Sequence, residues 1–258
     1  MKFGLLTKLT GLLAVLAITI AFAPHKTFAA DVVADLSKRL VPITTGFSGT
    51  DVLLFGAIDP IDSKEKDVIV TVTGPKDSIR IRKKERIAGV WINSNSALFK
   101  SAPAFYAAFA TRPLEDIAST LELESSEIGI DNLALASAYS RFSPNLEQEW
   151  QQALIRNMAA AKLYRSDIGS VTMLSDQLFR TDLHLPANVP TGTYTVGFYT
   201  VKNNRFIGAQ SMPLIVRKAG LGAWIYDFAH RSPALYGIIC VIIAIVAGYA
   251  SYFAFRRS

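Results

Sequence analysis

The hydrophobic pattern of this chain has its two longest apolar runs at its ends. Residues 234–255 form a run of 22 positions without a charged side chain. At a rise of ~1.5 Å per residue, a helix of this length spans a hydrocarbon core of about 30 Å. The pattern therefore predicts a transmembrane helix over 234–255, followed by a short tail at 256–258.

The N-terminal run is shorter and has the features of an export signal. Lys2 and Lys8 precede apolar residues 9–22, and small residues stand before the bond that follows Ala29. We predict a signal peptide over 1–29, with an uncleaved anchor as the alternative. A signal begins translocation and the later helix stops it. The predicted topology is a large periplasmic domain, one helix in the bacterial inner membrane and a cytoplasmic C-terminus.

Between the two runs, the predicted exported domain at residues 30–219 begins with a β pattern. The run at 51–58 is almost continuously apolar, which is expected of a strand buried on both faces. In the segment 78–84, Ile79 and Ile81 alternate with charged residues, so they should point inward while the charged residues point outward. Strands are predicted over 51–58, 67–73, 78–84, 86–92 and 104–110.

The period of the pattern becomes helical in the middle of the domain. A first helix is predicted over 113–123, and a second follows Ser143, which would cap it, with Pro144 at the first helical position. Apolar residues of the second helix fall on one face at helical spacing. They are Leu146, Trp150, Ala153, Leu154, Met158 and Ala161. We interpret 112–165 as a helical insertion, with two small domains as the alternative.

Strands return after residue 170. They are predicted over 177–185, 194–201 and 206–216, the last two joined by a hairpin turn. Gly192-Thr193-Tyr194 resembles the tyrosine corner of immunoglobulin-like sandwiches, although Val196 stands where an antibody domain has cysteine. The predicted fold is mainly β: an immunoglobulin-like β-sandwich with a helical insertion, plus the C-terminal transmembrane helix.

The segment between the domain and the membrane helix, residues 220–233, is itself amphipathic. Leu221, Trp224, Ile225 and Phe228 form a short apolar stripe. Trp224 and Tyr226 have side chains suited to the headgroup region of a bilayer. We predict that this segment lies at the membrane interface and seats the domain close to the lipid.

The formal charge of +6 does not indicate nucleic-acid binding. The exported segment 30–231 has 22 Lys and Arg against 21 Asp and Glu, so it is nearly neutral and lacks a phosphate-binding footprint. The only cysteine, Cys240, lies in the predicted membrane helix, so the exported domain folds without disulfides.

Candidate catalytic and metal-binding groups are few. Asp182 and His184 fall on one face of a predicted strand, but two ligands do not make a metal site. We interpret them as a carboxylate that orients a partly buried imidazole. No Gly-x-Ser-x-Gly elbow is present, so a hydrolase centred on His184 is only a minor alternative. We predict no metal, no cofactor and no enzymatic activity.

An acidic loop at residues 59–67 also carries no metal prediction. It contains Asp59, Asp62, Glu65 and Asp67. Lys64 and Lys66 oppose a calcium site there, and the spacing of an EF-hand loop is missing.

The best candidate binding surface is basic. Arg80, Arg82 and Lys84 alternate along one predicted strand and would form a row of cations on one face. Such a row fits an anion, lipid headgroups or a partner protein. The alternative is a solvated face on a sheet edge. Small residues one turn apart in the membrane helix also suit close contact with another helix.

Four segments resemble the alphaproteobacterial putative transmembrane protein family. They are residues 43–57, 86–92, 186–194 and 226–231. The resemblance implies an exported domain with one C-terminal helix and no established activity. Members of this family tend to accompany sulfite- or taurine-type exporter permeases, which implies an accessory role beside a polytopic anion permease.

Two functions follow as hypotheses. The first is a non-enzymatic accessory or binding subunit of a membrane partner. The second is an envelope structural or assembly protein whose sheet edge pairs with a client strand. The sequence leaves the oligomeric state open.

Overall fold

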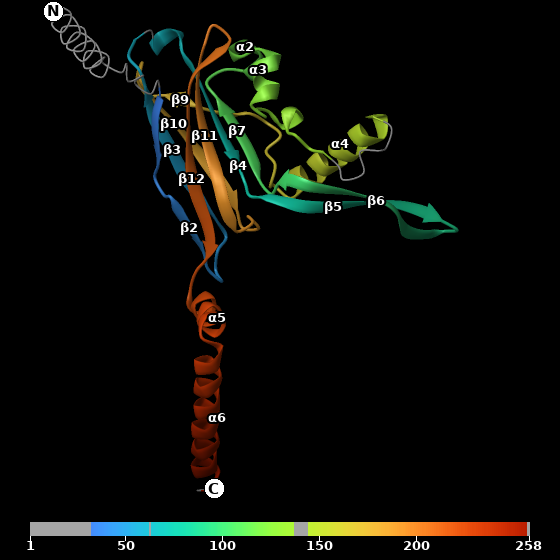
Figure 1. Ribbon diagram of the computed structural model, residues 1–258, viewed down its shortest axis with the longest axis vertical. Coiled ribbons are helices and arrows are strands. Elements are labelled where there is room, and N and C mark those ends of the chain that lie inside the picture. The colour runs from blue at the N-terminus through green and yellow to red at the C-terminus, as the bar shows by residue number, and fades with distance from the viewer. Residues whose placement is uncertain (1–31, 62, 137–143, 257–258) are drawn as a thin grey trace, which may run out of the picture. The chain divides into compact units, whose positions relative to one another are not determined.

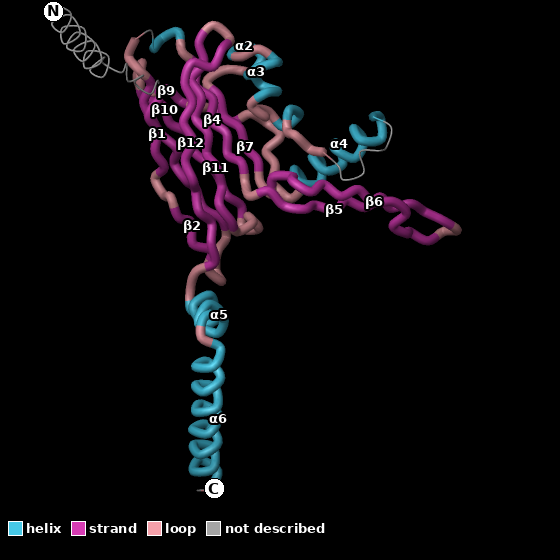
Figure 2. Tube along the Cα trace, viewed as in Figure 1, coloured by secondary structure: helices cyan, strands magenta, loops and turns pink. Residues whose placement is uncertain are grey.

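The computed structural model of the chain describes residues 32–61, 63–136 and 144–256. These residues lie mostly in strands, arranged in several sheets, with one apolar helix at the C-terminal end (Figures 1 and 2). The mainly β fold class is therefore confirmed. The predicted signal peptide, Asp62 and the proposed cap Ser143 lie outside the described residues.

Two larger sheets make up the body of the described chain. The four-stranded sheet has the order β1 (Val32–Leu36), β3 (Gly49–Ile58), β10 (Leu178–Pro186) and β9 (Thr172–Met173). The six-stranded sheet has the order β2 (Leu40–Ile43), β12 (Arg205–Lys218), β11 (Gly192–Lys202), β4 (Asp67–Thr73), β7 (Tyr106–Ala110) and β8 (Gly169–Ser170). The β2–β12 and β7–β8 pairs are parallel, and all others are antiparallel.

The largest apolar cluster of the described residues contains side chains from both of these sheets. On β3 the buried residues alternate: Val52, Leu54 and Ile58 are buried, whereas Phe55 is 41% exposed. The prediction that 51–58 is buried on both faces is therefore wrong. Only one face of this strand meets the other sheet, and the apolar residues on its second face are left partly exposed.

In the six-stranded sheet, β4 and β7 are buried on both faces. Val68, Val70 and Val72 belong to the cluster shared by the two sheets. Ile69, between them, belongs to a second cluster on the outer face of the six-stranded sheet. Because successive side chains of a strand point to opposite faces, an unbroken Val-Ile-Val pattern requires cover on both sides.

The predicted helical segment supplies this outer cover. It contains α2 (Leu114–Ile117), α3 (Thr120–Ser125), a 3₁₀ turn η2 (Ile130–Asn132) and α4 (Pro144–Ala160). A second 3₁₀ turn, η1 (Ser63–Glu65), precedes β4. The helix predicted over 144–161 is confirmed, and its Leu154 is fully buried.

The single helix predicted over 113–123 is wrong. The chain leaves the helical conformation at Ala118 and Ser119, both of which are extended. The Ser119 hydroxyl accepts a hydrogen bond from the backbone N–H of Glu122 at 3.4 Å and so caps α3. Because Ser119 caps a new helix, this segment forms the two short helices α2 and α3 in place of the single predicted helix.

The hairpin predicted near the C-terminal end of the domain is confirmed as β11 and β12. Asn203 and Asn204 both have positive φ angles, of 51° and 60°, as a two-residue type I′ turn requires. Before it, the Tyr194 hydroxyl donates a hydrogen bond to the carbonyl oxygen of Pro190 at 2.6 Å. This is the contact that a tyrosine corner makes. The immunoglobulin-like character of the sheets stays a prediction.

The strand predicted over 86–92 is wrong, because this segment turns the chain around. Ala88 and Gly89 have φ angles of 50° and 88° and form the tip of a two-stranded sheet. Its strands are β5 (Lys76–Ile87) and β6 (Val90–Pro103), of 12 and 14 residues. Figure 2 shows them as a ribbon separate from the other sheets. Apolar, β-branched residues on both sides of Ala88-Gly89 hid the turn in the sequence.

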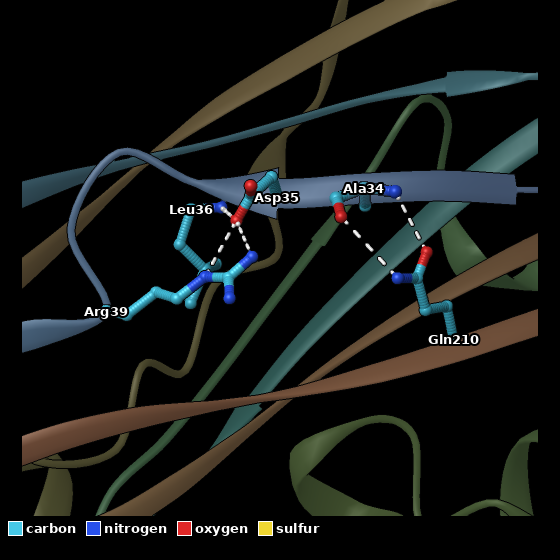
Figure 3. Close-up of polar contacts among 5 residues, drawn as sticks. All are labelled: Ala34, Asp35, Leu36, Arg39 and Gln210. Carbon is cyan, nitrogen blue, oxygen red and sulfur yellow. Dashed lines mark hydrogen bonds and ion pairs between the residues drawn. The ribbon is translucent and has the colours of Figure 1, made fainter.

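A polar contact ties the edges of the two larger sheets together (Figure 3). The side-chain amide of Gln210 on β12 accepts a hydrogen bond from the N–H of Ala34 on β1 at 2.8 Å and returns one to its carbonyl at 3.5 Å. Nearby, Asp35 accepts hydrogen bonds from the N–H of Leu36 and from Arg39. These contacts hold the turn through which the chain passes from one sheet to the other.

The chain ends in two helices, α5 (Leu221–Arg231) and α6 (Pro233–Phe255). The most apolar 18-residue window of the 23-residue helix α6 has a mean hydropathy of 2.4, and no residue of the helix is buried. By length and composition α6 can cross a membrane, which agrees with the prediction over 234–255. Among the described residues it is the one helix of this kind.

Replacement of Gly56 by alanine tests the close packing of β3 against its neighbours β1 and β10 in the four-stranded sheet. A Cβ atom at Gly56 would lie 2.6 Å from Cζ of Phe179 and 2.7 Å from the carbonyl oxygen of Val33. We expect Gly56→Ala to lower the free energy of unfolding by about 2 kcal/mol, measured by denaturant titration of the full chain in detergent. Gly46→Ala is the control, since nothing lies within 4 Å of a Cβ there. Equal effects of the two substitutions would contradict this packing.

Candidate functional site

The predicted basic surface lies on β5 and is open to solvent. Arg80, Arg82 and Lys84 are all exposed, and among the described residues no acidic side chain lies within ion-pair distance of them. Ile81, between the two arginines, is buried in the cluster beneath the hairpin. The two arginines therefore point away from the core, as the alternation predicted.

Lys84 lies beyond an irregularity in the hairpin. Lys83 pairs with Asn95 and Lys84 with Asn93, so that Ser94 has no partner opposite it. A bulge of this kind bends a strand pair and increases its local twist. The structure thus places Arg80 and Arg82 on one regular face, with Lys84 just past a point where the ribbon twists.

A neighbouring lysine attaches the hairpin to the helical segment. Lys83 Nζ lies 3.0 Å from Oε1 of Glu149 on α4. This carboxylate raises the pKa of Lys83 through a hydrogen bond and its charge. The base of the hairpin is also held by its core, where Ile81 and Phe99 share a cluster with Leu154 of α4. The basic face is therefore carried by an arm with a fixed base.

The outer half of the hairpin is exposed throughout. No residue from Arg82 to Ser96 is buried. Residues 79–98 contain five Lys and Arg and one Glu, whereas the predicted exported segment as a whole is nearly neutral. At the end of the arm, a set of apolar side chains is also exposed: Ile87, Val90, Trp91 and Ile92. This tip was missed in the sequence because 86–92 was interpreted as an ordinary strand.

The predicted pairing of His184 with Asp182 is wrong. Nδ1 of His184 instead lies 2.7 Å from Oδ1 of Asp51, which stands directly opposite it on β3. Both side chains are exposed, so the imidazole is not partly buried. Asp182 lies opposite Leu53 in the same register. Asp51 is the partner of His184 because β3 and β10, which are far apart in the sequence, pair in this register.

His184 also lines a cleft of about 450 Å³. Lys162, Arg165 and Asp167 contribute to the same lining. Arg165 binds Asp167 at 3.0 Å, and its guanidinium lies 5.2 Å from the ring centre of Phe109. Because His184 and Arg165 each have an acidic partner, the charges of this cleft largely balance one another.

Two described carboxylates of the acidic loop have separate basic partners. Asp67 binds Arg112 and the Thr111 hydroxyl. Glu65 lies 3.1 Å from Nζ of Lys202. Carboxylates engaged by separate basic partners do not converge on one point. Among the described residues, no group of three or more His, Cys, Asp or Glu side chains could hold a metal ion.

The segment next to the membrane helix is an amphipathic helix, α5. Trp224 and Tyr226 are 64% and 63% exposed, and the Trp224 ring stacks on Phe228 at a centroid distance of 5.7 Å. Only Ser232 separates α5 from α6. A cleft of about 1040 Å³ includes Arg217 and Tyr226 in its lining. An interfacial role of Trp224 and Tyr226 stays a prediction.

A family model described as putative transmembrane protein (Alph_Pro_TM) matches residues 31–257. No curated protein matches the chain. The matched range includes both larger sheets, the hairpin, α5 and α6.

The Asp67–Arg112 pair generates a pH-dependent prediction. Burial acts to raise the pKa of Asp67, but hydrogen bonds from Arg112 and Thr111 outweigh it and hold this pKa below 3.8. A depressed native pKa stabilises the fold at pH values above the unfolded pKa, and this stabilisation is lost as the pH falls through the native pKa. We expect Arg112→Ala to lower the free energy of unfolding at pH 7 by about 1 kcal/mol.

Denaturant titrations at pH 7 and pH 3 test this prediction. The difference between wild type and Arg112→Ala should shrink at the lower pH. Arg39→Ala is the control, because its pair with Asp35 is well exposed on both sides, and its effect should stay below about 0.5 kcal/mol. A difference for Arg112→Ala that does not change with pH would contradict the assignment.

His184→Ala tests whether the exposed imidazole has a structural role. Because both members of its pair are exposed, we expect the free energy of unfolding to change by less than about 0.5 kcal/mol. The measurement is a denaturant titration in detergent. A loss of 2 kcal/mol or more would show that the His184–Asp51 contact supports the fold, which this account does not predict.

Proposed function

The chain belongs to the family of putative transmembrane proteins named Alph_Pro_TM, and we propose that it is a membrane-anchored, non-enzymatic binding subunit. In this proposal α6 spans the inner membrane, the β domain lies in the periplasm and the C-terminus is cytoplasmic. The apolar helix and the signal-like N-terminal sequence support this topology. Trp224 and Tyr226 on α5 lie at the headgroup level.

The observation that carries the proposal is the construction of the β5–β6 hairpin. Its base is fixed by buried Ile81 and Phe99, whereas its outer half contributes no buried residue to the domain. An exposed two-stranded ribbon is only marginally stable by itself. The outer half of the hairpin therefore does not stabilise the domain, and we propose that it makes a contact outside the domain. The cations on its surface indicate the chemistry of that contact.

The partner in this proposal presents acidic groups or binds anions. Arg80 and Arg82 offer planar guanidinium groups that match carboxylates and other oxyanions. Lys84 adds a point charge beside them. The family resemblance favours a polytopic permease that exports a sulfite-type anion, with the hairpin held beside it by the membrane anchor. Attachment to the same membrane raises the effective concentration of the two proteins for each other.

A second function is supported by a different element. β1 is an edge of the four-stranded sheet, and its Val33 is 63% exposed. An edge strand can pair with an extended segment of another protein. This feature supports the alternative of an envelope assembly protein that binds a client strand. The short length of β1, five residues, limits such pairing.

Neutralisation of the basic face tests the proposed function. The triple variant Arg80→Gln, Arg82→Gln and Lys84→Gln removes three exposed charges without altering the core. If each of the three cations forms an ion pair with the partner worth about 0.5 kcal/mol, the affinity for the partner should fall roughly tenfold in this variant. The measurement is crosslinking in native membranes, affinity purification through a C-terminal tag and quantitative identification of the partners.

The control variant carries the same change of charge away from the hairpin. It combines Lys38→Gln, Arg180→Gln and Arg205→Gln, all at exposed positions. Recovery of a polytopic partner should fall only in the hairpin variant. Equal recovery from both folded variants would show that the basic face is not the contact surface.

A further inference from the structure

The end of the β5–β6 hairpin bears an apolar cluster that nothing in the described chain covers. Within six residues, four large apolar side chains are exposed: Ile87 at 54%, Val90 at 62%, Trp91 at 66% and Ile92 at 41%. Strand pairing places Ile87 opposite Val90, on the same face as Ile92, whereas Trp91 lies opposite Arg86 on the other face. Single exposed apolar residues are common, but four large ones within six residues at the end of an arm mark a binding surface.

The turn at the tip adds no polar side chain. Ala88 and Gly89 occupy its two central positions, both with positive φ. Asn or Asp is usual at the first of these positions, because these residues tolerate a positive φ and have polar side chains that suit contact with water. Alanine tolerates the conformation less well. The alanine keeps the outermost part of the arm apolar, which suits a tip that is buried in a non-aqueous environment.

Cations stand directly behind the tip. Arg86 lies opposite Trp91, and Lys84 and Lys83 follow two and three pairs further along the ribbon, behind the Glu85–Ile92 pair. Arg86 also donates a hydrogen bond from Nε to the carbonyl oxygen of Gly89 at 3.2 Å, which braces the turn. An apolar end containing Trp, followed by a group of Lys and Arg, is the arrangement that binds the interface of an anionic bilayer.

We infer that the hairpin tip is a second membrane contact, at which Val90, Trp91 and Ile92 enter the headgroup region of a bilayer that contains anionic phospholipid. Lys84 and Arg86 would then lie among the lipid phosphates, whereas Lys83 stays bound to Glu149. The part of β5 beyond buried Ile81, from Arg82 to Ile87, is about 20 Å long, so the tip lies clear of the packed base. The inference rests on the proposed function in taking α6 as the membrane anchor and the hairpin as the contact element.

Charge complementarity favours lipid over a second copy of the chain. Residues 79–98 carry five Lys and Arg and one Glu, while the rest of the segment 30–231 has 17 basic and 20 acidic residues. This small acidic excess is dispersed, and six of its carboxylates already lie beside basic partners. An anionic bilayer presents a dense negative surface, and α6 already holds the domain beside one.

A fluorescent probe at the tip tests the inference on the full chain. The native Cys240 is replaced through Cys240→Ala, and Val90→Cys is labelled with an environment-sensitive dye such as NBD. The protein is reconstituted in vesicles of phosphatidylcholine alone or with phosphatidylglycerol. We expect a blue-shifted, brighter emission only with phosphatidylglycerol, with quenching by brominated lipid and loss of the shift at high salt. Leu174→Cys, at an exposed apolar position in the β9–β10 turn, is the control and should not shift.

Three outcomes would overturn the inference. Equal emission in the two lipid mixtures would show that anionic lipid is not bound. A blue shift that depends on protein concentration would show that the tip packs against a second copy. A shift that occurs in native membranes but not in pure lipid would identify a protein as the occupant, and would leave the proposed partner contact standing.

The two proposals fail in different ways. If the Arg80, Arg82 and Lys84 variant loses no partner while the Val90→Cys probe still shifts with phosphatidylglycerol, the proposed function fails and the lipid contact stands. Replacement of Lys84 and Arg86 by Gln should abolish the lipid-dependent shift, and it leaves the Lys83–Glu149 pair in place. A shift that persists in this variant would contradict the role assigned to these cations.

Discussion

The rest of the structure depends on one constraint, the burial of the central strands β4 and β7 on both faces. Inward side chains such as Val70 and Phe109 fill the space between the two larger sheets, whereas Ile69 and Tyr106 point to the outer face. A sheet that is apolar on both faces cannot leave one of them in water. The outer face therefore requires cover, and the helical segment and the base of the β5–β6 hairpin supply it.

This cover determines where the functional element lies. The hydroxyl of Tyr164 donates to the carbonyl oxygen of Pro103 at 2.7 Å, at the point where β6 leaves the body. Burial raises the pKa of Tyr106 to about 12, in keeping with its position beneath the same cover. The hairpin thus starts from a packed and hydrogen-bonded base. Its outer half adds nothing to this packing, which leaves its cations and apolar tip free for contacts outside the domain.

Features set by local periodicity could be predicted from the sequence. Three elements could be recognised from their own residues alone: α6 from its uncharged run, α4 from its apolar stripe, and the β11–β12 hairpin from its alternation. The tip of the β5–β6 hairpin could not be predicted in this way, because Ala88-Gly89 lacks the usual turn residues and lies between β-branched neighbours. The partner of His184 was also inaccessible, since Asp51 meets it only through the register of β3 and β10.

The central claim is that the β5–β6 hairpin contacts a membrane partner, and site-specific photocrosslinking in native membranes tests it most directly. A photoreactive residue at the position of Arg82 would be compared with one at Leu174, which is also exposed but lies in the β9–β10 turn. The account predicts an adduct with a polytopic membrane protein from position 82 and none from position 174. Adducts of equal yield from both positions, or none from position 82, would contradict it.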